Sequence, residues 1–86
     1  MSSQDIENQV EVLARFDSAG LFPRVLKIGG QNYDIKKVNL MHSIHDGAVR
    51  IYFYSVSDDV NYWKLGFNTE TLSWWIEDNY SVNDAI

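Results

Sequence analysis

The residues with the clearest capacity for chemistry are His42 and His45, with Asp46 directly after the second histidine. On a helical turn, residues three apart share one face. Two imidazoles and a carboxylate on that face could hold a zinc ion. The chain has no cysteine and no third histidine to complete such a set. We therefore expect two solvent-facing histidines and no metal site.

Two pairs of adjacent carboxylates, Asp58–Asp59 and Glu77–Asp78, are the candidates for acid–base chemistry. General acid–base catalysis needs two carboxylates that converge on one substrate with separated pKa values. One pair falls in a predicted turn and the other at a strand end, so both are typical of solvated turns. Gly29–Gly30 precedes no helix start and does not form a phosphate loop. We predict that the protein is not an enzyme and binds no cofactor.

The elements that position these residues are organised around the stretch from Ala48 to Asp78, which holds all three tryptophans. Residues 48–57, 62–68 and 72–77 are rich in β-branched and aromatic side chains, which indicates three consecutive antiparallel strands. Polar turn residues separate them at 58–61 and again at 68–71.

Both turns predict the same division of side chains between two faces, because side chains alternate along a strand. The first turn pairs Ser57 with Tyr62, and the second pairs Phe67 with Leu72. The apolar face predicted from both turns contains Tyr52, Tyr54, Val56, Trp63, Leu65, Phe67, Leu72, Trp74 and Ile76.

The opposite face is amphipathic, and it provides the candidate contact surface: Phe53, Tyr62, Lys64 and Trp75. Phe53 should lie across from Gly66, and Trp75 across from Lys64 at cation–π distance. Two interpretations stay open. The N-terminal strands could cover this face as a second layer of core, or the face could be a half-exposed aromatic patch that contacts a partner.

The upstream segments supply further strands. Residues 9–16 alternate between apolar and polar side chains, which favours a half-buried strand, although a short amphipathic helix over 6–16 also fits. Gly29–Gly30 provides the turn of a hairpin between strands at 24–28 and 33–38.

The least determined segment is 39–47, where Leu40, Met41 and Ile44 fit either a short helical turn or an irregular strand. We predict one domain over residues 9–78, with a flexible arm at 1–8 and a flexible acidic tail at 79–86. The fold class is all-β: about six antiparallel strands in a meander, forming a small partly open barrel or a strongly curved sheet.

Charge and composition limit the partners. The chain of 86 residues carries seven basic and twelve acidic side chains, a net charge of −5. Because phosphate backbones are bound by clustered Lys and Arg, this balance disfavours nucleic acid. The absence of cysteine agrees with a reducing, cytoplasmic location. No apolar run approaches the roughly 20 residues that span a bilayer, so we expect no membrane insertion.

The order of core and turn residues carries a resemblance over roughly residues 10–78. One motif reads Pro23-x2-Leu26-x-Ile28-x-Gly30-x2-Tyr33-x-Ile35-x2-Val38, and a later one reads Phe67-Asn68-x2-Thr71-x2-Trp74. These motifs resemble a family of small uncharacterised bacterial all-β domains. Related segments occur at the C-terminus of inactive relatives of translesion DNA polymerases. The resemblance implies a small β-domain and suggests a link to DNA repair.

Two functions follow as hypotheses. The first is a non-enzymatic bacterial interaction module that uses the aromatic sheet face to contact a protein partner, or an exposed strand edge to self-associate. The second is a single-stranded nucleic-acid-binding accessory factor in DNA repair, in which exposed aromatic side chains would stack on bases.

Overall fold

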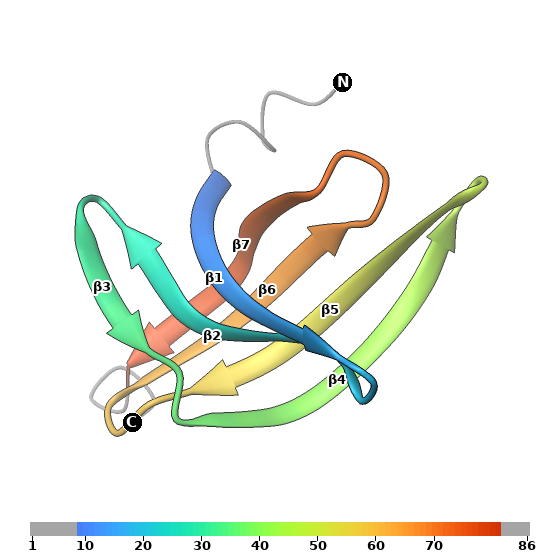
Figure 1. Cartoon of the computed structure of the whole chain (residues 1–86). Coiled ribbons are helices and arrows are strands. Elements are labelled where there is room, and N and C mark those ends of the chain that lie inside the picture. The colour runs from blue at the N-terminus through green and yellow to red at the C-terminus, as the bar shows by residue number, and fades with distance from the viewer. Residues whose placement is uncertain (1–8, 82–86) are drawn as a thin grey trace.

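The computed structural model describes residues 9–81, which form one antiparallel sheet of seven strands (Figure 1). The spatial order is β3-β2-β1-β7-β6-β5-β4. The strands are β1 (Gln9–Asp17), β2 (Gly20–Ile28), β3 (Gln31–Asp34), β4 (Lys37–Asp46), β5 (Val49–Ser57), β6 (Asn61–Asn68) and β7 (Ser73–Ser81). The all-β prediction is confirmed.

The sheet curls strongly, so that it forms half of a barrel (Figure 1). β1 pairs with β7 only at Gln9 and Val10. It then leaves β7 and carries β2 and β3 across the concave side of β4–β7, as the packing of their side chains on the core shows. Between β3 and β4, Ile35 N donates to Arg24 O of β2 and Lys36 N donates to Ser57 O of β5, both at 2.9 Å, so this short link joins the two ends of the sheet.

The concave side holds the core, and the tightly packed side chains come mostly from the predicted apolar face. Partly buried side chains of β1, β2 and β3 cover them. The N-terminal strands therefore cover this face and not the opposite one. The buried hydrophobic residues are Leu26, Ile35, Tyr54, Val56, Trp63, Leu65, Phe67 and Trp74.

The register of β5 with β6 is the predicted one, with Val56 paired to Trp63. The register of β6 with β7 differs from the prediction by two residues. Phe67 pairs with Trp74 and not with Leu72. A shift of two residues leaves residues 73–76 on their predicted faces, because the side-chain period of a strand is two. A bulge between Lys64 and Leu65 then increases the shift to three residues, so that Asp78 lies opposite Lys64.

Asn68 causes this shift. Its Oδ1 accepts hydrogen bonds from Glu70 N at 2.8 Å and Thr71 N at 3.1 Å, and its backbone O accepts one from Leu72 N at 2.8 Å. Asn68 therefore ends β6, and the loop runs over 69–72. Leu72 closes the loop with a φ of 62° and is 70% exposed, so its predicted place in the core is wrong.

The segment that the sequence left open between helix and strand is a strand. It extends β4 to Asp46, with a bulge between Val38 and Leu40. This accounts for the additional strand, because 33–38 is divided between β3 and β4. At the other end β7 continues to Ser81, beyond the domain boundary predicted at residue 78. The predicted arm at 1–8, and 82–86 of the predicted tail, lie outside the described residues.

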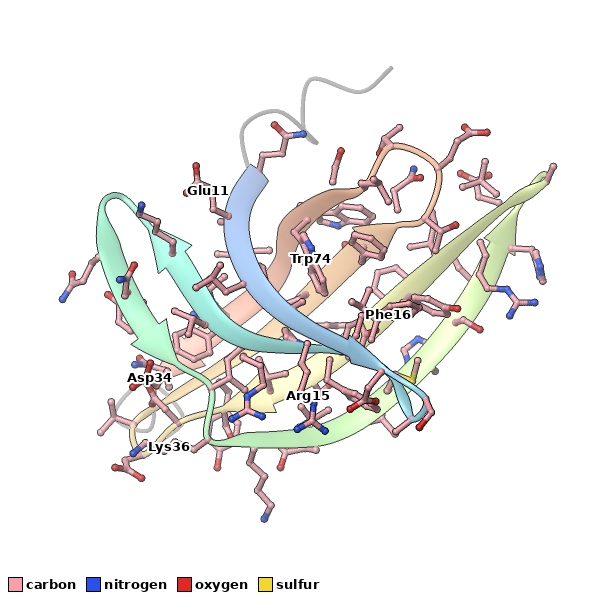
Figure 2. The ribbon with its side chains drawn as sticks, in the orientation of Figure 1. Glu11, Arg15, Phe16, Asp34, Lys36 and Trp74 are labelled. Carbon is pink, nitrogen blue, oxygen red and sulfur yellow. The ribbon has the colours of Figure 1, made fainter. Side chains whose placement is uncertain are left out.

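Figure 2 shows how β1 ends at the open side of the half-barrel. Trp74 points into the concave interior and is 8% exposed, whereas Phe16, near the end of β1, is 80% exposed. The interior is thus well packed at the β7 side of the sheet and less covered toward the ends of β1 and β4.

Candidate contact surface

The convex side of β4–β7, called the outer face here, carries the predicted contact residues. Strand register places Leu40, His42 and Ile44 of β4 on the same side as Ile51 and Phe53 of β5. On β6, Tyr62 and Lys64 alternate with the buried Trp63 and Leu65, so they also lie on this side. On β7, Trp75 alternates with the buried Trp74.

The centre of the outer face is a single cross-strand row. His42 lies opposite Phe53, Phe53 opposite Gly66, and Gly66 opposite Trp75. The rings of His42 and Phe53 stack, with centroids 5.3 Å apart. Those of Phe53 and Trp75 meet edge to face at 6.3 Å, across the strand that carries Gly66. Three rings from three strands therefore form one continuous aromatic strip.

Gly66 permits this strip because it has no side chain. A Cβ at this position would lie 2.3 Å from Cε2 of Trp75. The indole of Trp75 thus occupies the space that a side chain at residue 66 would need. The predicted pairing of Trp75 with Lys64 is wrong, because the shifted β6–β7 register brings Asp78 opposite Lys64.

Charges border the strip without interrupting it. Nζ of Lys64 lies 5.2 Å from the ring centroid of Phe53, a cation–π distance. Nε1 of Trp75 donates to Oε1 of Glu77 at 2.9 Å. The charged side chains beside the strip, Lys64 and Glu77, therefore both contact its rings. The hydrogen bond to Glu77 also fixes the orientation of the indole of Trp75.

Exposure distinguishes the outer face from the core. Phe53, Lys64 and Trp75 are half-buried, and Tyr62 is 39% exposed. The structure brings Phe53, Lys64 and Trp75 into mutual contact through the ring of Phe53. Tyr62 lies on the same face, further along β6 and opposite Ser57.

Sequence reasoning missed the contribution of β4. Leu40 is 58% exposed and Ile44 is 45% exposed, and they flank His42 on the outer face. The alternation of Leu40, His42 and Ile44 is the strand signal that could have found them. The same apolar residues also fit a helical turn, which hid that signal.

Gly66→Ala should lower the free energy of unfolding by about 1–3 kcal/mol, because the new methyl group forces the indole of Trp75 off its site. Urea denaturation followed by far-UV circular dichroism measures this change.

The matched control is the double variant. In a Trp75→Ala background the clash is gone, and glycine inside a strand is itself unfavourable by roughly 0.5–1 kcal/mol relative to alanine. Gly66→Ala should then be neutral or stabilising. Additive costs of the two substitutions would show that Trp75 does not occupy the space above Gly66.

The histidines and carboxylates singled out in the sequence do not converge. In a strand, residues three apart point to opposite faces, so His42 stacks on Phe53 while Nε2 of His45 lies 3.4 Å from an Arg50 nitrogen. Within residues 9–81, no group of three or more His, Cys, Asp or Glu side chains is arranged to hold a metal.

Asp58 organises the β5–β6 turn. Its Oδ1 accepts hydrogen bonds from the backbone N–H groups of Val60 and Asn61, both at 2.8 Å. Burial acts to raise the pKa of Asp58, but these hydrogen bonds, together with the Asn61 side chain and the charge of Lys36, lower it below the ordinary value. A carboxyl group held ionised in this way caps a turn.

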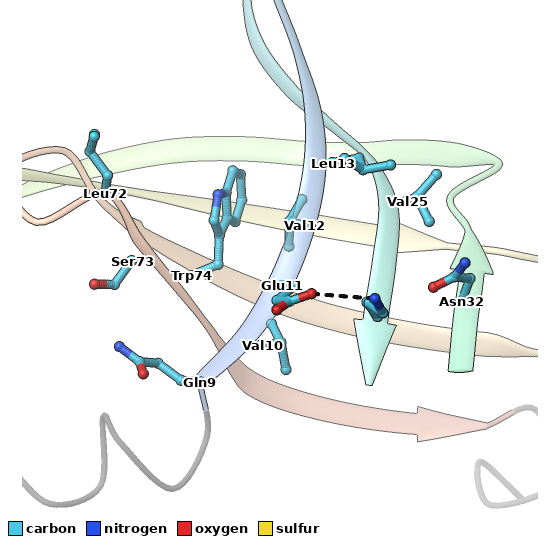
Figure 3. Close-up of a pocket in the computed structure, with 11 residues that line it drawn as sticks. Gln9, Val10, Glu11, Val12, Leu13, Val25, Asn32, Leu72, Ser73 and Trp74 are labelled. Atoms are coloured by element: carbon cyan, nitrogen blue, oxygen red, sulfur yellow. Dashed lines mark ion pairs between the residues drawn. The ribbon is translucent and has the colours of Figure 1, made fainter. Parts of the chain in front are cut away.

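A groove of about 640 Å³ opens where β1 leaves β7 (Figure 3). Val12, Leu72 and Trp74 contribute apolar walls, and the Glu11–Lys27 ion pair, 3.6 Å between Oε1 and Nζ, lies at its side. The divergence of β1 from β7 creates this groove, which is separate from the outer face.

The fold and the outer face together define a class: a small all-β domain with an aromatic strip on the convex side of its sheet. No protein-family model, curated protein or solved structure matches the chain. The resemblance to small bacterial β-domains therefore stays a prediction. Among the described residues no helix is long and apolar enough to cross a membrane.

Proposed function

We propose that this chain is a non-enzymatic interaction module that binds a protein partner through the outer face. The observation that carries this proposal is the aromatic strip of His42, Phe53 and Trp75, which β1–β3 leave uncovered because they pack on the concave side. Large aromatic side chains on a rigid support are typical of binding hot spots.

Preorganisation supports the same proposal. Trp75 is held by Gly66 below it, by the edge contact with Phe53 and by its hydrogen bond to Glu77. A side chain already fixed before binding loses little conformational freedom when a partner covers it. Exposed Leu40 and Ile44 enlarge the apolar area around the strip.

The charges indicate the kind of partner. The outer face contains Lys64, but Asp78 lies opposite it and Glu77 is bonded to Trp75. With a net charge of −5, the chain favours a protein surface that offers apolar groups and a basic rim. The proposed setting is the cytosol, as the absence of cysteine suggests, of a bacterium, as only the resemblance to small bacterial β-domains implies.

Single-stranded nucleic acid is the alternative ligand. The contact of Lys64 with Phe53 is the observation that favours it, because a cation beside a stacking ring suits a nucleotide. Titration of labelled oligonucleotides at low and moderate salt tests this alternative. Salt-sensitive binding that quenches tryptophan fluorescence would support it over a protein partner, and no binding at low salt would exclude it.

The test of the protein-partner proposal begins with capture on immobilised wild-type protein and identification of the bound protein by mass spectrometry. The purified partner is then titrated against two outer-face variants, Tyr62→Ala and Phe53→Ala, by isothermal calorimetry, after circular dichroism has shown that both are folded. The Kd should rise at least about tenfold for each variant, which corresponds to a loss of roughly 1.4 kcal/mol.

Val60→Ser provides the control, because Val60 is 56% exposed but lies in the β5–β6 turn, outside the outer face. Its Kd should equal that of the wild type. A partner whose affinity is unchanged by Tyr62→Ala and Phe53→Ala, or lowered equally by Val60→Ser, would contradict the assignment.

A further inference from the structure

β4 is an unprotected sheet edge. Among the strands of residues 9–81 it is the last one in the sheet, with β5 as its only neighbour, and it is ten residues long (Figure 1). Edge strands are normally protected by shortness, proline or charge. The opposite edge, β3, has four residues, whereas β4 carries no proline and no Lys, Arg, Asp or Glu between Lys37 and Asp46.

The hydrogen bonds of β5 determine which backbone N–H and C=O groups of β4 face the open edge. The carbonyl of Arg50 accepts hydrogen bonds from Thr69 N at 3.2 Å and Thr69 Oγ1 at 2.7 Å, so it faces away from β4. The pair of Arg50 with His45 therefore exchanges no backbone hydrogen bonds. Because such pairs alternate in an antiparallel ladder, His45, Ser43 and Met41 direct their N–H and C=O groups to the open edge.

We propose that β4 pairs with β4 of a second copy of this chain, antiparallel and across a two-fold axis at His42. In this register Met41 exchanges hydrogen bonds with Ser43 of the other copy, so the groups that face the edge meet each other. The register uses only residues 40–44, which lie beyond the bulge between Val38 and Leu40.

The side chains are self-complementary in this register. On the outer face Leu40 lies opposite Ile44 of the other copy, on both sides of a central pair of His42 side chains. Both Leu40 and Ile44 are substantially exposed in the single chain. Neighbouring registers are less complementary, because they pair Leu40 with His42 or with Asp46.

Charge also favours a second copy as the occupant. Antiparallel pairing brings the Lys36–Lys37 end of one β4 toward the Asp46 end of the other, at both ends of the interface. The paired sheets would join the outer faces of the two copies into one surface. The pairing goes beyond the proposed partner binding and does not depend on it.

Cysteine cross-linking tests the register directly, because the chain has no cysteine. Residues in a pair without backbone hydrogen bonds have Cα atoms about 4.5 Å apart, within the range that a disulfide spans. His42→Cys should therefore form a covalent dimer on mild oxidation. Met41→Cys is the matched control and should not, since its two copies would be more than about 7 Å apart.

Analytical ultracentrifugation over a range of concentrations is the second measurement. Wild type and Val60→Lys should dimerise, whereas Ile44→Lys should stay monomeric. A monomeric wild type without a His42→Cys cross-link, or faster cross-linking of Met41→Cys, would overturn the proposal. A monomer that still binds the protein partner through Trp75 would overturn only this pairing, and a dimer without partner binding only the proposed function.

Discussion

Trp74→Ala is expected to lower the free energy of unfolding by about 3–5 kcal/mol, the usual cost of removing a large aromatic side chain from a core. Trp74 is 8% exposed, and its ring centroid lies 4.6 Å from that of Phe67 and 5.6 Å from that of Tyr54. The cavity left by the substitution would remove the contacts of β7 with the concave core at this position. Urea denaturation followed by far-UV circular dichroism measures the loss.

The stability loss caused by Trp75→Ala is the comparison for that of Trp74→Ala. Trp75→Ala removes a half-buried ring from the outer face, so its cost should be only about 1–2 kcal/mol, and the variant should stay folded. Equal losses of unfolding free energy for the two substitutions, or a larger loss for Trp75→Ala, would contradict the assignment of Trp74 to the core and Trp75 to the outer face.

The second large effect is a loss of stability at alkaline pH that depends on Tyr54. Tyr54 is fully buried and its hydroxyl donates to Leu21 O at 2.5 Å. Burial first, and then the nearby Tyr52, raises the pKa of Tyr54 from 10.0 to about 12. The unfolded chain releases this proton first, so stability that is complete below pH 10 should fall by about 2 kcal/mol as the pH approaches 12.

Tyr54→Phe isolates this group. At neutral pH the variant should be less stable than wild type by about 1 kcal/mol, because Leu21 O loses its hydrogen-bond donor. The difference should shrink to zero or reverse by pH 12, since phenylalanine does not titrate. Urea denaturation at pH 8 and pH 12 gives both values. A constant difference across this range would show that Tyr54 does not remain protonated in the folded chain.

Much of the central meander was predictable, because the side chains of β5, of β6 and of β7 as far as Ile76 alternate between the two faces. The face that holds Tyr54, Val56 and Trp63 followed from strand period and one well-placed turn at Asp58. Leu72 was misplaced for a local reason. The sequence does not show whether Asn68 is the last residue of the strand or the first residue of the turn. Its hydrogen bonds to Glu70 and Thr71, which only the structure shows, decide this.

The part that sequence reasoning could not determine is tertiary. Which face β1–β3 cover depends on where β1 leaves β7, and that is determined by packing on Trp74 and not by local propensity. The contribution of β4 was hidden for a different reason: His42 and Ile44 fit two periodicities. Phe53, Lys64 and Trp75 were nevertheless grouped correctly, because alternation alone places them on one side.

We propose that the concave face maintains the fold while the outer face binds a protein. The most direct test is the affinity of the purified partner for Trp75→Ala, measured by isothermal calorimetry on protein shown to be folded. We expect a Kd at least about tenfold higher than that of wild type. An unchanged Kd would contradict it.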